Sequence, residues 1–130
     1  IRCIAIGGAY SVDKWLRLQF DMGWFPDEQP SDQIREDVEE KLAEVDWNVD
    51  VVFSHTCPLR YEPVEVFLPQ VDQNTVDKST EQWLGEIEGN LQYSCWFCGH
   101  WHLNKHIDKI HFLYHDVESL ELLKGGDFYV

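Results

Sequence analysis

The stretch Val49-Asp50-Val51-Val52-Phe53-Ser54-His55 decides the fold, because an apolar run of strand length ends there in polar residues. Residues 93–98 form a second such run, which leads directly into Gly99-His100-Trp101-His102. A third run, Ile4-Ala5-Ile6, ends at Gly7-Gly8, the pattern of a buried strand followed by a tight turn. Ligands bind beyond the carboxyl ends of the strands in α/β sheets, so the sequence predicts an α/β fold with its functional residues at these ends.

Three segments between these strands are predicted to be helical. Residues 12–20 form a short helix, and a longer helix begins after Ser31 as its N-cap. The inner face of the longer helix is expected to consist of Ile34, Val38, Leu42 and Val45. The third helix begins at Ser79, in a capping box with Gln82. Its inner face is expected to consist of Leu84, Ile87 and Leu91.

The remaining segments are harder to assign. Residues 58–78 show no convincing period, and a segment of this length is either a lid or substrate-binding segment or a connector. Antiparallel strands are predicted around residues 107–115, 118–123 and 127–130, with the last hairpin turning at residues 124–127. The 130 residues are expected to form one α/β domain without internal repeats.

Charge and composition exclude several classes of function. The chain has 24 acidic and 10 basic residues, a net charge of -14, so it lacks the basic stripe that nucleic-acid binding needs. The acidic surplus is either a solvated surface or a site that collects divalent cations. No apolar run approaches the roughly 18 residues of a membrane span. The 4 cysteines accompany a full apolar core, which favours reduced thiols and a cytoplasmic location. Because Ile1 leads at once into a strand, we expect further sequence before it.

Three histidines at two strand ends are the candidate metal ligands. His55 follows one strand, whereas His100 and His102 lie on the turn after the other. Imidazole suits borderline divalent transition metals, and histidines at i and i+2 on a turn can point at different ions. A lone histidine is more often an ordinary core or surface residue, so the prediction depends on the two strand ends together.

These blocks resemble the calcineurin-like metallophosphoesterase family, in which a metal-binding histidine after a strand precedes a Gly-His-x-His motif. The similarity includes residues 7–14 with Arg17, residues 24–28 and residues 50–58, so it covers nearly the whole chain and looks like bacterial or phage members. The resemblance implies the C-terminal half of a two-sheet α/β sandwich. In that fold this half is a mixed sheet with helices and a C-terminal antiparallel hairpin.

The resemblance also implies a phosphoesterase site with two divalent metal ions, manganese, iron or zinc. His55 and His100 would bind one ion and His102 the other, and a metal-activated hydroxide would hydrolyse a phosphomonoester or phosphodiester. The family motifs Asp-x-His, Gly-Asp-x-x-Asp and Gly-Asn-His-Asp/Glu, which supply the carboxylates and the catalytic histidine, are not in this sequence. We therefore expect this chain alone to be inactive and to need further sequence, a second chain or a dimer.

Tyr10, Lys14 and Arg17 are the candidate substrate-binding residues, because they follow the Gly7-Gly8 turn. The two cations either meet a phosphate group or form surface ion pairs, and Tyr10 either forms a pocket wall or packs in the core. Cys95 and Cys98 match a zinc-binding Cys-x-x-Cys spacing, but a strand points them to opposite faces, which favours a packing role.

The other histidines, His106, His111 and His115, match no family motif and are expected to be structural or solvent-facing. Even spacing would place His111 and His115 on the same face of a strand. The alternative function is a non-catalytic binding module with at most one structural metal. In that case residues 58–78 would contact a protein partner.

Overall fold

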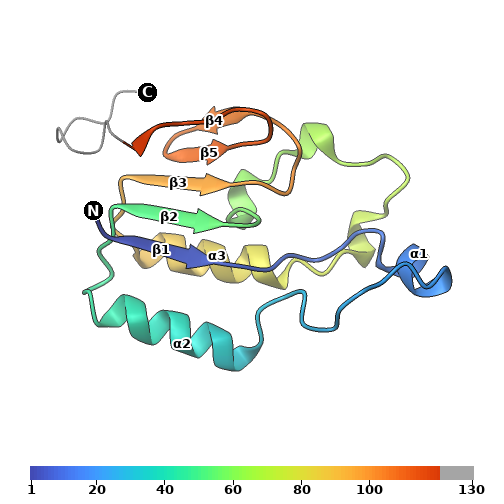
Figure 1. Cartoon of the computed structure of the whole chain (residues 1–130), viewed down its shortest axis with the longest axis horizontal. Helices are drawn as coiled ribbons and strands as arrows, with labels where there is room; N and C mark the ends of the chain where they lie inside the picture. Colours follow the sequence, from blue (N-terminus) through green and yellow to red (C-terminus); the bar gives the residue numbers. More distant parts are fainter. Residues whose placement is uncertain (121–130) are drawn as a thin grey trace.

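Five strands form one mixed sheet in the computed structural model, which describes residues 1–120 (Figure 1). They are β1 (Cys3–Ile6), β2 (Val51–Ser54), β3 (Cys95–Cys98), β4 (Lys105–Ile107) and β5 (Ile110–Phe112). Their spatial order is β1-β2-β3-β5-β4, in which β4 alone is antiparallel to its neighbour. The predicted α/β class is confirmed at this level: a mixed sheet with helices.

The three predicted helices are α1 (Lys14–Gln19), α2 (Asp32–Ala43) and α3 (Ser79–Asn90). The Ser31 cap is confirmed, because its Oγ accepts the Ile34 N–H at 3.3 Å. The predicted cap of α3 is wrong. Ser79 is already the first helical residue, and its hydroxyl faces Gln29 and Arg35, so the Asp77 carboxylate accepts the Ser79 N–H instead, at 2.9 Å.

The helices α2 and α3 pack against one face of the sheet and bury the main core. The strands contribute Val52, Trp96, Ile110 and Phe112 to it. The helices contribute Leu42, Trp83, Leu84 and Ile87. The inner face predicted for α3 is confirmed, but that of α2 is shorter than predicted. Ile34 is 50% exposed because it lies in the first turn, outside the part of α2 that contacts the core.

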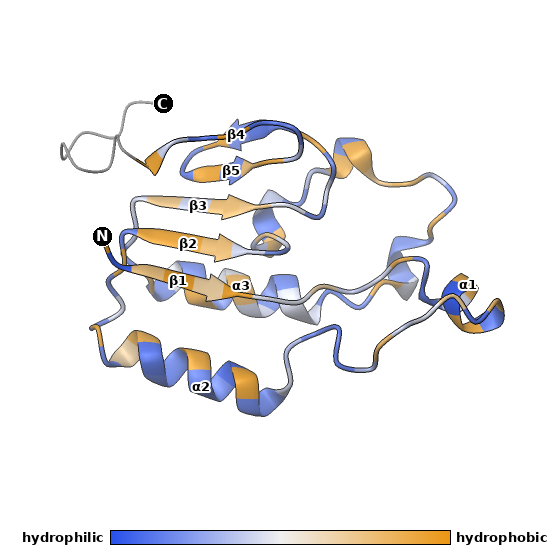
Figure 2. Cartoon of the chain, in the orientation of Figure 1, coloured by the Kyte–Doolittle hydropathy of each residue, from blue (hydrophilic) through white to orange (hydrophobic). Residues whose placement is uncertain are grey.

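The opposite face of the sheet carries a smaller cluster of Val51, Cys95 and Phe97, against which Leu113 and Leu120 pack. Figure 2 shows that the central strands are hydrophobic, as expected for strands buried on both faces. Within residues 1–120, no helix covers this second face, and two of its side chains, Cys3 on β1 and Phe53 on β2, are exposed. Cys95 and Cys98 belong to opposite clusters, which confirms the predicted alternation.

The strand predicted around residues 107–115 is confirmed only in part, because β5 covers Ile110–Phe112 alone. β4 and β5 form a short antiparallel hairpin, and Asp108, with φ 52°, lies in the turn between them. A strand ending at Phe112 leaves His115 outside it. Residues 118–120 are not a strand, whereas residues 121–123, the turn at 124–127 and the strand at 127–130 lie outside the described residues.

Residues 58–78 contain three short 3-10 turns, η1 (Leu59–Tyr61), η2 (Val64–Val66) and η3 (Gln73–Thr75). Figure 1 shows this segment, between β2 and α3, running beyond the carboxyl ends of the strands. None of the described helices is long and apolar enough to cross a membrane.

Candidate functional site

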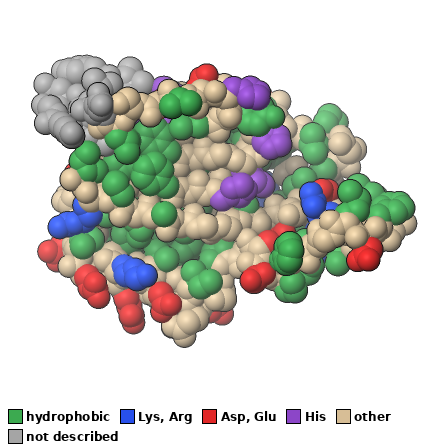
Figure 3. Space-filling model, viewed as in Figure 1, with side chains coloured by type: hydrophobic (Ala, Val, Ile, Leu, Met, Phe, Trp, Pro, Cys, Tyr) green, Lys and Arg blue, Asp and Glu red, His purple; other side chains and the backbone are tan. Residues whose placement is uncertain are grey.

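A cleft of about 520 Å³ lies at the carboxyl edge of the parallel strands. It is formed by the loops that follow β1, β2 and β3, together with the first turn of α3. Its lining includes Tyr10, Arg17, Val66, Phe67, Leu68, Glu81, His100, Trp101 and His102. The volume lies within the range of roughly 300–1,000 Å³ that is usual for small-molecule sites. Figure 3 shows histidine side chains gathered on this side of the molecule.

His55 and His100 meet at this edge because β2 and β3 are parallel neighbours. Ser54 is the register partner of Cys98, so both strands end at the same level. The loops after them are joined by the Gly99 N–H, which donates to the His55 carbonyl at 3.1 Å. As a result, Nε2 of His55 and Nδ1 of His100 lie 3.2 Å apart. Two of the three predicted ligands are therefore in direct contact.

The backbone of the Gly-His-Trp-His turn has an unusual conformation. His100 and His102 both have left-handed φ angles, 66° and 53°, which are uncommon for residues other than glycine. Trp101 between them stacks against Phe67, with ring centroids 5.7 Å apart. The two histidine rings point to different neighbours: His100 faces His55, whereas His102 stacks on Tyr114 at 4.8 Å. Strained non-glycine residues of this kind often occur at functional sites.

The electrostatics of the histidine pair favour neutral rings. Burial, together with the nearby His55 and His102, lowers the pKa of His100 to about 4. Desolvation is also the main reason why the pKa of His55 is lowered. A neutral imidazole is the form that binds metal ions, so neither ring needs to lose a proton to do so near neutral pH.

The predicted substrate-binding residues divide into two groups. Tyr10 and Arg17 line the cleft, and Arg17 also pairs with Asp13, its Nε lying 2.9 Å from a carboxylate oxygen. Lys14 does not line it, because its ammonium group lies over the ring of Trp24, 4.2 Å from the centroid. Arg17 therefore forms an ion pair, which is one of the two alternatives expected for the cations. Lys14 instead makes a cation–π contact that the sequence did not indicate.

Carboxylates are scarce beside the histidine pair. Within residues 1–120, only one group of three possible metal ligands has its donor atoms close together. It consists of His106, His111 and Glu118, whose donor atoms lie within 4.8 Å of one another, at β4, β5 and the segment after β5. Of the acidic surplus, a large share lies on the exposed face of α2, at Asp32, Glu36, Asp37, Glu39 and Glu40. Those residues fit the solvated-surface alternative. Within the described residues, the predicted trio thus forms no compact ligand group with a carboxylate.

Glu81 is a cleft residue that sequence reasoning missed. It is 4% exposed, and one carboxylate oxygen accepts a hydrogen bond from Thr56 Oγ1 at 2.9 Å. Within the described part of the chain, its Oε2 has no hydrogen-bond partner. Burial is the main reason why the pKa of Glu81 is raised. An acidic residue in the first turn of a helix is usually exposed to solvent, where it interacts favourably with the helix dipole. The sequence therefore does not mark Glu81 as unusual, and only the packing of α3 under the cleft shows that it is buried.

Comparison with known proteins gives no match: no family model, no curated protein and no solved structure is significantly similar to this chain. The fold and the cleft define the chain as a mixed α/β domain with a histidine pair at the carboxyl edge of its parallel strands. Its function is therefore argued from these residues.

Proposed function

We propose that this chain is the C-terminal half of a calcineurin-like, metal-dependent phosphoesterase that hydrolyses a phosphomonoester or phosphodiester. The observation that carries the proposal is the 3.2 Å separation of His55 Nε2 and His100 Nδ1 at the carboxyl edge of the sheet. Nitrogen ligands lie about 2.0–2.1 Å from a zinc ion, so two ligands of one tetrahedral ion are about 3.3 Å apart. The distance between the two nitrogens is thus close to that between two ligands of one divalent ion.

His102 is the proposed ligand of a second ion. The left-handed backbone at His100 and His102 turns their rings apart, as two separate ions require. Ions in two-metal sites are about 3.5–4 Å apart, so the ligand of one ion need not touch those of the other. Manganese, iron and zinc all accept imidazole ligands. When bound, such ions lower the pKa of a bound water and neutralise charge on phosphoryl oxygens.

The chain's own contribution to substrate binding is proposed to come from Tyr10 and Arg17, which line the cleft. A guanidinium group has five N–H donors, of which the Asp13 pair uses only part, so Arg17 can still bind a phosphoryl oxygen. Phe67 and Trp101 stack on each other and form an apolar part of the cleft wall.

The remaining ligands are proposed to come from another part of the sandwich, either further sequence or a second chain. Three neutral imidazoles supply no negative charge to hold two divalent ions together, and no carboxylate joins the pair among residues 1–120. No helix of the described chain covers the sheet face on which Cys3 and Phe53 are exposed, so this part of the face is the proposed docking surface for a second sheet. The 130-residue chain alone is therefore expected to be inactive.

The test compares the chain alone with the product that also includes the sequence encoded upstream of Ile1. With Mn²⁺, the longer product is expected to hydrolyse p-nitrophenyl phosphate or its bis ester, and the chain alone is not. His100→Ala should lower kcat/KM of the longer product at least about 100-fold, because a metal ligand is lost. His115→Ala, at an exposed histidine outside the cleft, is the matched control. Activity that His100→Ala leaves unchanged would contradict the proposal.

A non-catalytic binding module is the second candidate, and α1 and the loop after it favour it. Several large apolar side chains are exposed there: Trp15, Leu18, Phe20, Met22 and Phe25. Residues 58–78, by contrast, pack over the cleft, so α1 is the better candidate for contact with a protein partner. If this function is correct, Leu18→Asp should abolish partner capture, and the upstream-extended product should hydrolyse neither ester.

A further inference from the structure

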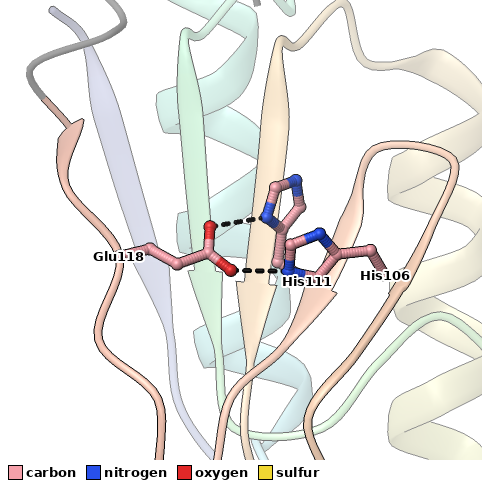
Figure 4. A group of neighbouring side chains, drawn as sticks. All are labelled: His106, His111 and Glu118. Atoms are coloured by element: carbon pink, nitrogen blue, oxygen red, sulfur yellow. Dashed lines mark hydrogen bonds and ion pairs between the residues drawn. The ribbon is translucent and has the colours of Figure 1, made fainter. Parts of the chain in front are cut away.

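The β4–β5 hairpin places two histidines directly opposite each other. His106 and His111 are register partners in the antiparallel pair, so their side chains lie on the same face of the sheet. Their ring centroids are 4.3 Å apart, and Figure 4 shows the two rings side by side. The expectation that His111 shares a strand face with His115 is wrong, because β5 ends at Phe112; the strand partner of His111 is His106.

Glu118 completes the group from the segment that follows β5. Its Oε1 lies 2.6 Å from His106 Nε2, and its Oε2 lies 2.8 Å from His111 Nδ1. Figure 4 shows the carboxylate pointing at both rings. The donor atoms of all three residues lie within 4.8 Å of one another. Three side chains from three separate positions of the chain thus converge on one point.

From this convergence we infer a metal site: His106, His111 and Glu118 hold one divalent transition-metal ion, separate from the histidine pair at the cleft. Two imidazoles and one carboxylate are a usual ligand set for zinc and related ions. Unlike the three histidines of the cleft and its turn, this group includes a negative charge. The inference does not depend on the proposed hydrolysis.

The distances show what binding would change. With metal–ligand bonds of about 2.0–2.2 Å, neighbouring ligand atoms of a tetrahedral ion lie about 3.3 Å apart. The nitrogen–oxygen distances of 2.6 and 2.8 Å would therefore open by about 0.7 and about 0.5 Å, respectively. At present each is a hydrogen bond with a proton between the two atoms. To bind an ion there, a neutral ring must carry its proton on its other nitrogen, so that the nitrogen facing Glu118 offers a lone pair to the ion.

The proposed ligands differ in exposure: His111 is held in the interior, whereas His106 is accessible from solvent. The side chain of His111 is 5% exposed and packs against Phe97, with ring centroids 4.9 Å apart, which fixes the orientation of its ring. The side chain of His106 is 43% exposed, so an ion can enter from solvent on that side. With three protein ligands, a tetrahedral ion keeps one position for water or for a ligand from outside.

The simpler explanation is that Glu118 only bridges two histidines and fastens the segment after β5 to the sheet. Titration of the full chain with Zn²⁺, followed by calorimetry, and with Co²⁺, followed by visible absorption, distinguishes the two. His55→Ala/His100→Ala removes the cleft pair and serves as the background. In this background we expect one bound ion per chain, with the absorption of a tetrahedral cobalt site.

Glu118→Gln and His106→Ala are the test variants in that background, and His115→Ala is the matched control. Glu118→Gln keeps the side chain's size and one acceptor, and His106 is exposed, so circular dichroism should show a folded chain for both. Each should weaken Zn²⁺ binding at least about 100-fold, whereas His115→Ala should leave it unchanged. No bound ion in the background protein, or binding that both test variants leave unchanged, would overturn the inference.

Discussion

The cleft edge and the β4–β5 hairpin both bring histidines together, but in opposite ways. At the cleft, His55 and His100 come from sequence patterns that predict metal binding, yet no carboxylate joins them in the described chain. At the hairpin, His106 and His111 belong to no motif, yet they share a carboxylate and form a compact group. Sequence patterns thus indicate which chemistry a region can perform, whereas only the fold shows which ligand set is complete.

Trp101→Ala should have the largest effect and should separate the two regions. Trp101 packs against Phe67 and the main core between the two strained histidines, so its removal should cost about 3 kcal/mol of the free energy of unfolding. The Gly-His-Trp-His turn should lose its conformation, while the hairpin stays intact. Urea unfolding measures the stability, and cobalt absorption at the hairpin should be unchanged; its loss would show that the two regions are coupled.

Gly8→Ala should have a smaller effect, in the loop that follows β1 at the cleft. Gly8 has a φ of 97°, and a Cβ there would lie 2.8 Å from Pro30 Cδ and 2.9 Å from the Glu28 carbonyl. Strain of this kind costs about 1–3 kcal/mol. The loop that carries Tyr10 and Arg17 should shift, which raises KM for phosphoester in the extended product more than it lowers kcat. Gly89→Ala is the control, because no atom lies within 4 Å of the added Cβ.

Glu81→Gln should have the smallest effect, and it depends on pH. The pKa of Glu81 is raised, mainly by burial; Glu62 also raises it, whereas Thr56 and Lys78 lower it. A carboxyl group with a raised folded-state pKa favours folding below its unfolded pKa and loses this contribution as pH rises through the folded pKa. The variant should therefore match the parent near pH 4 and exceed it at pH 7, by about 1 kcal/mol or less. Thermal unfolding at both pH values measures this; equal pH profiles would contradict it.

Local patterns predicted most of the fold. The strand ends, the three helices and the Ser31 cap follow from apolar runs, helical spacing and capping residues, which act over a few residues. The hairpin was missed because β4 and β5 have three residues each, too few for a period to show. The exposure of Ile34 depends on where α2 meets the sheet, which spacing along the helix cannot reveal.

The candidate site was predicted less completely. His55 and His100 could be paired because parallel strands that end in histidines bring them to one edge. Lys14 could not be placed, since its contact with Trp24 depends on the path of the loop after α1. Glu81 and Glu118 were missed because their roles depend on contacts with Thr56 and with the hairpin histidines, which no local pattern encodes.

The four cysteines provide a means of observing the sheet face that no helix among residues 1–120 covers. Cys57, Cys95 and Cys98 are buried, and burial raises the pKa of Cys95 to about 11 and of Cys98 to about 12. Cys3, the register partner of Val51 on the edge strand β1, is exposed. A maleimide fluorophore should thus label Cys3 selectively in the folded protein, and its emission would report directly when another polypeptide docks beside β1.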